Sequence, residues 1–324
     1  MRPDGRDLTE RILYLRSIPV GGALSPRVLR AIASTLRERT FPKGTPLMRE
    51  NEPIHALHLL TSGSVSLSRR GTSLGTLRPP QTLGFLGIMA QSGGTYDAIC
   101  DEDTRTFEVP ADALSDLLED QFEFLHATLR YMADRLYYDM QDLPGEAFGS
   151  EPELDPKLPE RPLDLVERIW VVRGYSGFKK TNLNALASLC QQCEEVRFEP
   201  GTRVWSAGDP APSTFLLVRG TIGCVTARGT QFRYGPSTAV GGIDAFADKP
   251  RWYSATTETK VLGLRVMSDR FVDLLENDFS LANNFLASLA STLVTLVARK
   301  AELGHDPLAQ RRDVSRLGAV PLGA

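Results

Sequence analysis

The chain has 324 residues, which is long enough for two domains that each bury a core. Hydrophobic residues make up 42% of it, aromatic residues 8% and charged residues 24%, a composition typical of soluble globular proteins. The net charge of -3 gives no electrostatic reason to expect nucleic acid or an anionic membrane as a partner, since such partners usually require a basic patch.

The beginning of the chain, Met1 to Leu13, is charged and polar and lacks the apolar segment of a signal peptide. The sequence also lacks an uninterrupted apolar run of about 18 residues. We therefore expect a cytoplasmic protein that does not insert into a membrane. Four cysteines in a chain without a secretory signal argue against a disulfide framework.

The first half of the chain predicts a helix, then several short strands, then two more helices. Apolar residues at helical spacing predict the first helix from Ser25 to Arg39. Short β-branched runs separated by Gly, Pro, Asn and Asp follow in residues 40–44, 50–53, 57–67 and 99–109. A short helix opens at Pro110, and a long helix closes the series. Evenly spaced strands of this kind predict a sandwich or a roll.

The second half repeats the first at a fixed offset of 157 residues. Glu10-Arg11-Ile12 returns as Glu167-Arg168-Ile169, and Leu117-Leu118-Glu119 returns as Leu274-Leu275-Glu276. One offset holds over about 125 residues without a gap, the signature of a duplicated domain. The equivalent predictions are a helix over 182–195, strands within 256–266, and a short helix opening at Ser268.

The long helix of each copy carries an apolar stripe with spacings of three and four residues. The stripe residues are Leu125, Leu129, Met132, Leu136, Met140 and Leu143 in the first copy, and Phe285, Leu289, Leu293, Leu296 and Lys300 in the second. Three partners are open for such a stripe: the roll of its own copy, the other copy, or a second chain. In the last case the chain would form a homo-oligomer.

These patterns divide the chain into four parts. Two domains are predicted, over residues 1–143 and 163–303. Residues 144–162 contain five prolines and several acidic side chains, which indicates a semi-rigid linker. Residues 304–324 form a charged tail that is too short for a folded module, and its role is left open.

Glycines recur at fixed positions in both copies and end at a distinctive stretch. Gly44, Gly63 and Gly84 have the same spacings as Gly201, Gly220 and Gly241. After Gly241 the chain reads Gly242-Ile243-Asp244-Ala245-Phe246-Ala247-Asp248-Lys249-Pro250-Arg251. This stretch resembles the phosphate-binding cassette of the cyclic-nucleotide-binding domain family, whose pattern is F-G-E-x-A-L-L-x-x-x-P-R.

The resemblance covers nearly all of both copies and implies a mainly β fold with flanking helices. Two tandem β-rolls of the double-stranded β-helix or jelly-roll type are expected, each closed by a long C-terminal helix. The tandem layout is similar to the regulatory subunits of cAMP-dependent protein kinase. A single copy resembles the ligand-binding half of catabolite-activator-type transcription factors.

The family's ligand residues are retained only in part. In the family, a short helix N-terminus and an arginine hold the cyclic phosphate, and a glutamate accepts hydrogen bonds from the ribose. The candidate ligand-binding residues of the second copy are Gly241, Gly242, Ile243, Pro250, Arg251 and Trp252. Arg251 matches the phosphate-binding arginine, whereas Gly242 replaces the glutamate. Trp252 stands where a small residue is usual, and it either stacks on a base or fills the pocket.

Both anchors are missing from the first copy. Its equivalents are Gly84, Phe85 at the glutamate position, Gly93, and Gly94 at the arginine position. A hydrogen bond to a charged group contributes roughly 1.5–3 kcal/mol, so losing both anchors weakens binding by on the order of a thousand-fold or more. The first copy is therefore predicted not to bind a cyclic nucleotide. For the second copy, cAMP or cGMP binding, a different phosphate ligand, and a degenerate pocket with a solvated surface arginine all stay open.

Three other motifs have simpler explanations. Gly71-Thr72-Ser73-Leu74-Gly75 fits the G-x-S-x-G pattern of a nucleophile elbow, but the following Thr-Leu-Arg-Pro-Pro cannot open a helix, so a hairpin turn is favoured. Cys190 and Cys193 have redox or metal spacing, but their repeat equivalents Ala33 and Leu36 favour core positions. His55 and His58 are predicted to face opposite sides of one strand, which excludes a shared metal.

The sequence thus predicts a non-enzymatic regulator or adaptor that requires no cofactor and acts on a protein partner. In this interpretation, the second roll senses a cyclic nucleotide or another phosphate ligand through Arg251. The alternative is a structural scaffold or assembly subunit in which both pockets are degenerate. A transcription factor is disfavoured, because only about 20 residues follow the last helix where that family places a helix-turn-helix.

Overall fold

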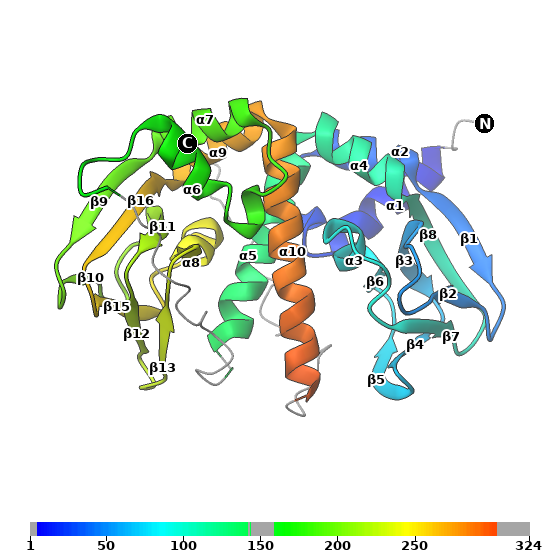
Figure 1. Cartoon of the computed structure of the whole chain (residues 1–324). Coiled ribbons are helices and arrows are strands. Elements are labelled where there is room, and N and C mark those ends of the chain that lie inside the picture. Colours follow the sequence, from blue (N-terminus) through cyan, green and yellow to red (C-terminus); the bar gives the residue numbers. More distant parts are fainter. Residues whose placement is uncertain (1–4, 142, 144–158, 303–324) are drawn as a thin grey trace, which may run out of the picture. The chain divides into compact units, whose positions relative to one another are not determined.

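The computed structural model describes residues 5–141, 143 and 159–302. Contacts divide the chain into two units, Met1–Tyr131 with the chain from Ala290, and Met132–Leu289. Each unit is described by itself, and Figure 1 labels its helices and strands. Most of the predicted linker, and the whole predicted tail, lie outside the described residues.

The first copy begins with α1, a 3-10 turn and α2, continues with eight strands that α3 interrupts, and ends with α4 and α5. The helical elements are α1 (Gly5–Ser17), η1 (Gly21–Ala23), α2 (Pro26–Thr35), α3 (Phe85–Met89), α4 (Ala111–Asp120) and α5 (Phe122–Gln141). The strands are β1 (Arg37–Phe41), β2 (Pro46–Met48), β3 (Ala56–Ser62), β4 (Val65–Arg69), β5 (Thr72–Leu77), β6 (Thr82–Leu83), β7 (Asp97–Cys100) and β8 (Thr104–Pro110).

The second copy repeats this order element by element. Its helical elements are α6 (Leu165–Val172), η3 (Ser176–Phe178), α7 (Leu183–Gln192), α8 (Gly242–Ala247), α9 (Ser268–Asn277) and α10 (Phe279–Glu302). Its strands are β9 (Glu194–Phe198), β10 (Arg203–Trp205), β11 (Ser213–Arg219), β12 (Ile222–Thr226), β13 (Gln231–Tyr234), β14 (Thr238–Val240), β15 (Tyr253–Thr257) and β16 (Val261–Met267).

Each copy folds its strands into two antiparallel sheets of four. The first copy has the orders β1-β8-β3-β6 and β2-β7-β4-β5, and the second has the equivalent orders β9-β16-β11-β14 and β10-β15-β12-β13. Non-consecutive neighbours in every sheet mean that the chain winds back and forth between two sheets, as in a roll. The predicted fold class, two tandem β-rolls with flanking helices, is confirmed.

The first predicted helix of each copy starts where expected and ends early. Ser25 and Asn182 are the N-caps of α2 and α7, and each accepts a hydrogen bond from the amide three residues on. The predicted ends at Arg39 and Glu195 are wrong. Both helices stop at the extended residues Leu36 and Cys193, because the first strand of the roll begins immediately after them.

The G-x-S-x-G stretch forms a hairpin turn, as predicted. Strands β4 and β5 pair antiparallel, and Arg70 and Gly71 connect them with φ of 48° and 77°. Two successive left-handed residues match the twist of paired strands. Ser73 therefore lies in a strand and not at the strand-to-helix turn that a nucleophile elbow requires.

The apolar stripe of α5 is buried, and that of α10 is buried in part. Leu125, Leu129 and Leu136 of α5 are at most 1% exposed, and Leu289, Leu293 and Leu296 of α10 are at most 9% exposed. Phe285 and Lys300 are half-buried. The boundary between the compact units falls within both helices, so each helix contributes residues to both units. Residues 279–300 of α10 are long and apolar enough to cross a membrane by length and composition alone, with a mean hydropathy of 1.5. Since core helices meet the same criterion, the finding carries no further conclusion.

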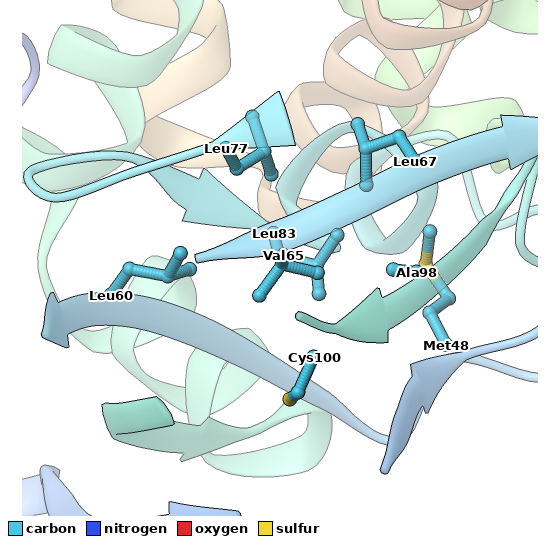
Figure 2. Packing of buried hydrophobic residues seen from close by; sticks show 8 residues of the cluster. All are labelled: Met48, Leu60, Val65, Leu67, Leu77, Leu83, Ala98 and Cys100. Atoms are coloured by element: carbon cyan, nitrogen blue, oxygen red, sulfur yellow. The ribbon is translucent and has the colours of Figure 1, made fainter. Parts of the chain in front are cut away.

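The interior of the first roll is filled mainly by aliphatic side chains. Figure 2 shows eight of them gathered among the strands. They are Met48, Leu60, Val65, Leu67, Leu77, Leu83, Ala98 and Cys100, all 7% exposed or less. Tyr96 is partly buried against this cluster, and desolvation raises the pKa of its hydroxyl to about 12. The space that a ligand would need inside this roll is thus occupied by side chains.

One arginine in each copy caps the helix that precedes the roll. Arg168 Nη1 lies 3.0 Å from the carbonyl oxygen of Cys193 and 3.4 Å from that of Cys190, and it donates to both. Arg11 donates in the same way to Leu36 and Ala33, the residues 157 positions earlier. The last carbonyls of a helix have no intrahelical partner, so a cation placed there satisfies them.

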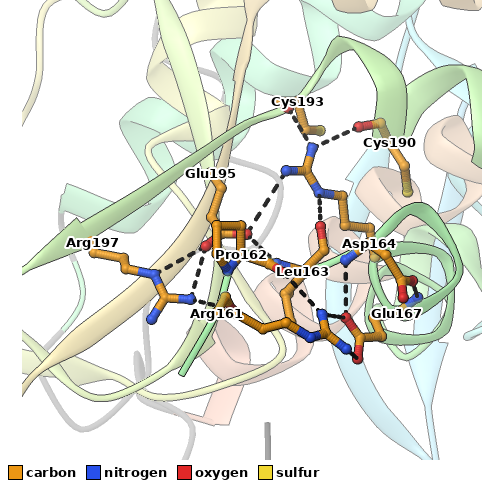
Figure 3. Close-up of polar contacts among 10 residues, drawn as sticks. Arg161, Pro162, Leu163, Asp164, Glu167, Cys190, Cys193, Glu195 and Arg197 are labelled. Carbon is orange, nitrogen blue, oxygen red and sulfur yellow. Dashed lines mark hydrogen bonds and ion pairs between the residues drawn. The ribbon is translucent and has the colours of Figure 1, made fainter. Parts of the chain in front are cut away.

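In the second copy this cap is part of a larger polar network. Figure 3 shows the chain of polar contacts that leads from the carbonyl groups of Cys190 and Cys193 through Glu195 to Arg197 and Arg161. Arg168 Nη2 lies 3.8 Å from Glu195, whose side chain is 9% exposed, and Glu195 also accepts from Arg197 at 3.0 Å. The network joins α6 to the C-terminal end of α7 and the first strand of the roll.

Both copies also contain a hydrogen bond from a tyrosine hydroxyl to a strand carbonyl group. The Tyr14 hydroxyl donates to the carbonyl oxygen of Leu60, and the Tyr175 hydroxyl donates to that of Leu217 at 2.7 Å. Leu60 and Leu217 are equivalent under the repeat, but the two tyrosines differ by four positions, about one helical turn. The two copies therefore keep the same hydrogen bond from different positions in the sequence.

Replacing the capping arginine is expected to destabilise the second copy. Arg168→Met leaves two helix carbonyls and Glu195 without their cation, and we expect the free energy of unfolding to fall by about 1.5–3 kcal/mol. All three tryptophans lie between Met132 and Leu289, so urea unfolding followed by tryptophan fluorescence reports on this unit. The matched control is Arg197→Met, which removes a more exposed contact to the same Glu195 and should cost less than about 1 kcal/mol. Equal losses in the two variants would contradict the capping role.

Candidate functional site

The second cassette has the predicted form of a short helix between two strands. Strand β14 ends at Val240, Gly241 adopts a left-handed conformation with φ of 72°, and α8 follows directly. Asp248, at φ 54°, ends the helix, and the chain enters β15 two residues after Arg251. The predicted site residues of this copy therefore lie on one continuous turn–helix–turn segment at the end of the roll.

Arg251 does not lie on the surface. It is 4% exposed, which excludes the solvated arginine that the sequence left open. Nη1 donates to the carbonyl oxygen of Gly241 at 2.6 Å, and Nη2 donates to that of Ser213 at 2.7 Å. The guanidinium also lies 4.2 Å from the ring centroid of Trp205, within the range of a cation–π contact. Arg251 thus joins the cassette to the start of β11.

A buried carboxylate faces this guanidinium. Asp244, on α8, is 1% exposed, and its Oδ2 lies 3.5 Å from Nη1 of Arg251. The family pattern has a small alanine at this position. Burial raises the pKa of Asp244 from 3.8 to about 7, because desolvation outweighs the opposing effect of Arg251. A charged aspartate here therefore depends on its arginine.

Several polar atoms of this cluster lack hydrogen bonds within the described part of the chain. These are both carboxylate oxygens of Asp244, Nε of Arg251 and Nε1 of Trp205. Buried polar atoms are rarely left without partners, and each one costs stability. The cluster is thus held by two good hydrogen bonds, one longer ion pair and one ring contact.

Both cassette glycines are closely packed, and Gly241 leaves no room for a Cβ. A Cβ on Gly241 would lie 2.1 Å from Nη1 of Arg251, so the arginine itself requires glycine there. A Cβ on Gly242, at the position of the family's glutamate, would lie 3.2 Å from the Thr214 side chain. The polar ribose anchor is therefore absent, and its position is closely packed.

Aromatic rings occupy the interior next to Arg251. Trp252 is 8% exposed and stacks on Phe232, with ring centroids 5.5 Å apart and planes at 19°. Tyr253 packs edge-on against Trp252 at 4.9 Å and lies 5.8 Å from Trp205. Of the two alternatives for Trp252, the structure shows the one in which this side chain fills the roll.

Within the same compact unit, the C-terminal half of α5 contacts the residues just before Arg251. The Tyr137 hydroxyl donates to the carbonyl oxygen of Pro250 at 3.1 Å. Lys249 Nζ lies 3.4 Å from Oδ1 of Asp134 and 5.6 Å from the ring centroid of Tyr138. These contacts fix Lys249 and Pro250 to α5, whereas the carbonyl oxygens of Gly241 and Ser213 fix the side chain of Arg251.

The first cassette has neither anchor nor space for one. A Cβ on Gly94, at the arginine position, would lie 2.2 Å from the carbonyl oxygen of Arg49, and one on Gly93 would lie 3.2 Å from Asn51. Gly84 precedes α3 with φ of 93°, like Gly241 in the second copy. Phe85, at the glutamate position, lines an apolar cavity of about 70 Å³ together with Leu15, Leu57 and Phe124.

The remaining candidates from the sequence take structural roles. Cys190 and Cys193 are buried in the core, and burial raises the pKa of their thiols to about 11 and 12, which keeps them protonated. His58 is buried against Phe41, and desolvation lowers its pKa. Among residues 5–141, 143 and 159–302, no group of three or more His, Cys, Asp or Glu side chains is placed to hold a metal. His305 lies outside this part.

Two residues of the cluster were missed by the sequence analysis. Asp244 departs from the family's alanine, and that departure was the available signal. Trp205 lies on β10, far from the cassette in sequence, and its equivalent in the first copy is Met48. A pattern confined to the cassette gives no reason to associate Trp205 with Arg251.

Removing the arginine is expected to destabilise the second unit. In Arg251→Met, two carbonyls lose their donor and Asp244 loses its counter-ion, and we expect the free energy of unfolding to fall by about 3–5 kcal/mol at pH 8. Urea unfolding followed by tryptophan fluorescence measures this loss. The control is Arg233→Met, which breaks an exposed pair with Glu258 and should leave the midpoint nearly unchanged. An arginine reserved for a ligand would behave like the control.

The raised pKa of Asp244 predicts a dependence of stability on pH. The folded chain holds the proton on Asp244 more tightly than the unfolded chain, so protonation stabilises the fold. This gain is complete below about pH 4 and is lost as the pH rises through about 7. From pH 8 to 6, the wild type should gain about 1 kcal/mol relative to Asp244→Asn, whose side chain does not titrate. Parallel pH profiles for the two proteins would contradict this assignment.

Comparison with known proteins places these two cassettes in a family. Residues 38–121 and 195–278 each match the model of the cyclic nucleotide-binding domain, and the two matches are offset by the same 157 residues as the repeat. A CRP-like cAMP-activated global transcriptional regulator of Mycobacterium tuberculosis is 28% identical over 118 residues, covering 35% of this chain and 53% of the relative. An uncharacterised NTE family protein of Mycobacterium bovis is 25% identical over 136 residues, covering 42% of this chain and 23% of the relative.

The chain therefore spans about half the length, or less, of these curated relatives. Among solved structures, the regulatory domain of Toxoplasma gondii PKA with cAMP has a TM-score of 0.36 and 12% identity, over 89% of this chain and 98% of that one. The regulatory subunit of a cAMP-independent protein kinase A from Trypanosoma cruzi, bound to guanosine, has a TM-score of 0.37 and 11% identity, over 93% and 91%. At these scores the structural likenesses carry no argument. Because the family model covers both copies and more than half of the residues, the chain belongs to the cyclic nucleotide-binding domain family and carries two of its domains in tandem.

Proposed function

We propose that this chain is a non-enzymatic regulator or adaptor that acts through protein contacts, and that neither of its two cassettes binds a cyclic nucleotide. The observation that carries this proposal is the state of Arg251. Its guanidinium is buried and bonded to two carbonyl oxygens and a carboxylate of its own chain. The proposal combines the regulatory role predicted from the sequence with the degenerate pockets of the alternative.

A phosphate would have to compete with these internal partners. Hydrogen bonds from a charged donor contribute roughly 1.5–3 kcal/mol each, so exchanging the two carbonyls alone removes at least about a hundred-fold from the affinity. The loss of the ribose-binding glutamate at Gly242 weakens binding further. The rings of Trp252, Phe232 and Tyr253 pack on one another next to Arg251, and a nucleotide bound to Arg251 would have to displace this packing.

The first copy supports the same conclusion on different residues. Its roll is filled by aliphatic side chains, and the backbone of Arg49 closely abuts Gly94. An arginine cannot be accommodated there without moving the loop. Both rolls are therefore better explained as rigid frames that present surfaces than as pockets that open to a nucleotide.

The remaining aspects of the proposal rest on the family and the sequence. The regulatory role is supported by the tandem family match, whereas the identity of the partner, a homo-oligomer through the closing helices, and a cytoplasmic location stay predictions. The non-enzymatic role is supported by the position of Ser73 in a hairpin strand, which removes the hydrolase motif found in the sequence. The cAMP activation stated for the mycobacterial relative belongs to that protein.

Isothermal titration of the full chain tests this proposal. At pH 8, where Asp244 is charged, cAMP, cGMP and cyclic dinucleotides should give no binding heat, with any dissociation constant weaker than about 1 mM. A matched variant is Gly242→Glu, which restores the family's ribose anchor and should still show no heat, because Arg251 stays occupied. Saturable binding to the wild type, lost in Arg251→Lys, would instead establish the second copy as a nucleotide sensor.

A further inference from the structure

The buried carboxylate of Asp244 lies next to the arginine that the family uses for phosphate. We propose that the second cassette keeps an anion site that the chain fills with its own Asp244 side chain, which thereby excludes external anions. Asp244 is then the residue that determines specificity at this site. The inference rests on the proposed function, because it explains why the retained arginine does not bind a nucleotide.

The geometry supports an internal ligand. The two carbonyl partners of Arg251 are neutral, so they orient the guanidinium without neutralising it. The negative charge that faces it comes from Asp244, with 3.5 Å between Oδ2 and Nη1. Both residues are at least 96% buried, and an unpaired charge at this depth is strongly unfavourable. The aspartate therefore supplies the charge that a bound phosphate supplies in the family.

The repeat provides an independent observation. Under the offset of 157, Asp244 and Arg251 correspond to Gly87 and Gly94 in the first copy. The copy without the arginine also lacks the aspartate, and the copy with the arginine has both. A Cβ on Gly87 would lie 2.3 Å from the Ile54 side chain, so the first copy has also closed the space that an aspartate would need.

The packing limits which external anion could replace Asp244. The neighbouring rings of Trp205, Trp252 and Tyr253 are buried, which favours an anion much smaller than a nucleotide. Substituting the aspartate by alanine, the family's residue, removes one carboxylate group and frees a space of that size beside the guanidinium. The anion that fits is a small carboxylate, and formate reproduces the missing group.

Chemical rescue of Asp244→Ala tests the inference. In the full chain at pH 8, we compare thermal unfolding in sodium formate and in sodium chloride of equal ionic strength, followed by tryptophan fluorescence. With an affinity on the order of 10 mM, 100 mM formate should raise the midpoint of this variant by about 3–6 °C. Acetate should have less effect, because its methyl group meets the alanine side chain.

The controls separate this site from others. Asp244→Asn is uncharged but keeps the space filled. For this variant and for the wild type, the unfolding midpoint in formate should therefore equal the midpoint in chloride. If Asp244→Ala folds only in formate, its refolding yield in formate against chloride replaces the midpoint as the readout. No preference for formate in either measurement would overturn the inference, as would an equal preference in all three proteins. Nucleotide binding by the wild type would refute the proposed function separately, because that result is obtained without any change at Asp244.

Discussion

The second domain depends on a buried guanidinium that binds its own chain. Arg251 connects the turn before α8 to the start of β11 through two carbonyl oxygens, and it packs on the face of Trp205. Its position also explains Gly241, since Nη1 would lie 2.1 Å from a Cβ at that residue. The position of the arginine thus requires a glycine at residue 241, whether or not a ligand binds.

The two copies share a frame and differ in their interiors. Strand orders are identical, and Arg11 and Arg168 cap equivalent helices through equivalent carbonyls. The hydrogen bond to Leu60 or Leu217 is kept even though its tyrosine lies within α1 in the first copy and after the end of α6 in the second. In contrast, the first interior is aliphatic and the second is aromatic with one buried ion pair. The two copies therefore share the contacts that hold their backbones in place and differ in the side chains that fill their interiors.

The sequence predicted the frame well because its signals are local or repeated. Ser25 and Asn182 mark helix starts through their own side chains, and the offset of 157 transfers each assignment from one copy to the other. The helix ends were wrong because the roll begins at the next residue, and a tertiary contact overrides the helical pattern there. The hairpin at Gly71 was predicted correctly, since its turn needs a residue that tolerates positive φ.

The state of the candidate site was not predictable in the same way. Cassette spacing identified Arg251, but whether an arginine faces solvent, a ligand or its own chain depends on residues distant in sequence, such as Ser213 and Trp205. The family's cassette pattern identifies residues that agree with it, such as Arg251. Asp244 is important because it differs from the family's alanine. Burial gives that departure its effect, and burial of Asp244 follows only from the folded roll.

A sensor requires polar groups that are oriented but unsatisfied until the ligand arrives. In the second cassette, the same two carbonyl groups both orient the guanidinium of Arg251 and accept its hydrogen bonds. A ligand therefore gains little affinity by replacing them. Tyr137 and Asp134 of α5 also contact Pro250 and Lys249, which fixes the end of the cassette just before Arg251. These contacts all favour the same arrangement of the cassette, and a ligand changes an equilibrium only if it binds two states differently. Any regulation by this chain is therefore better sought in the surfaces that the rolls present than in the interiors that they have filled.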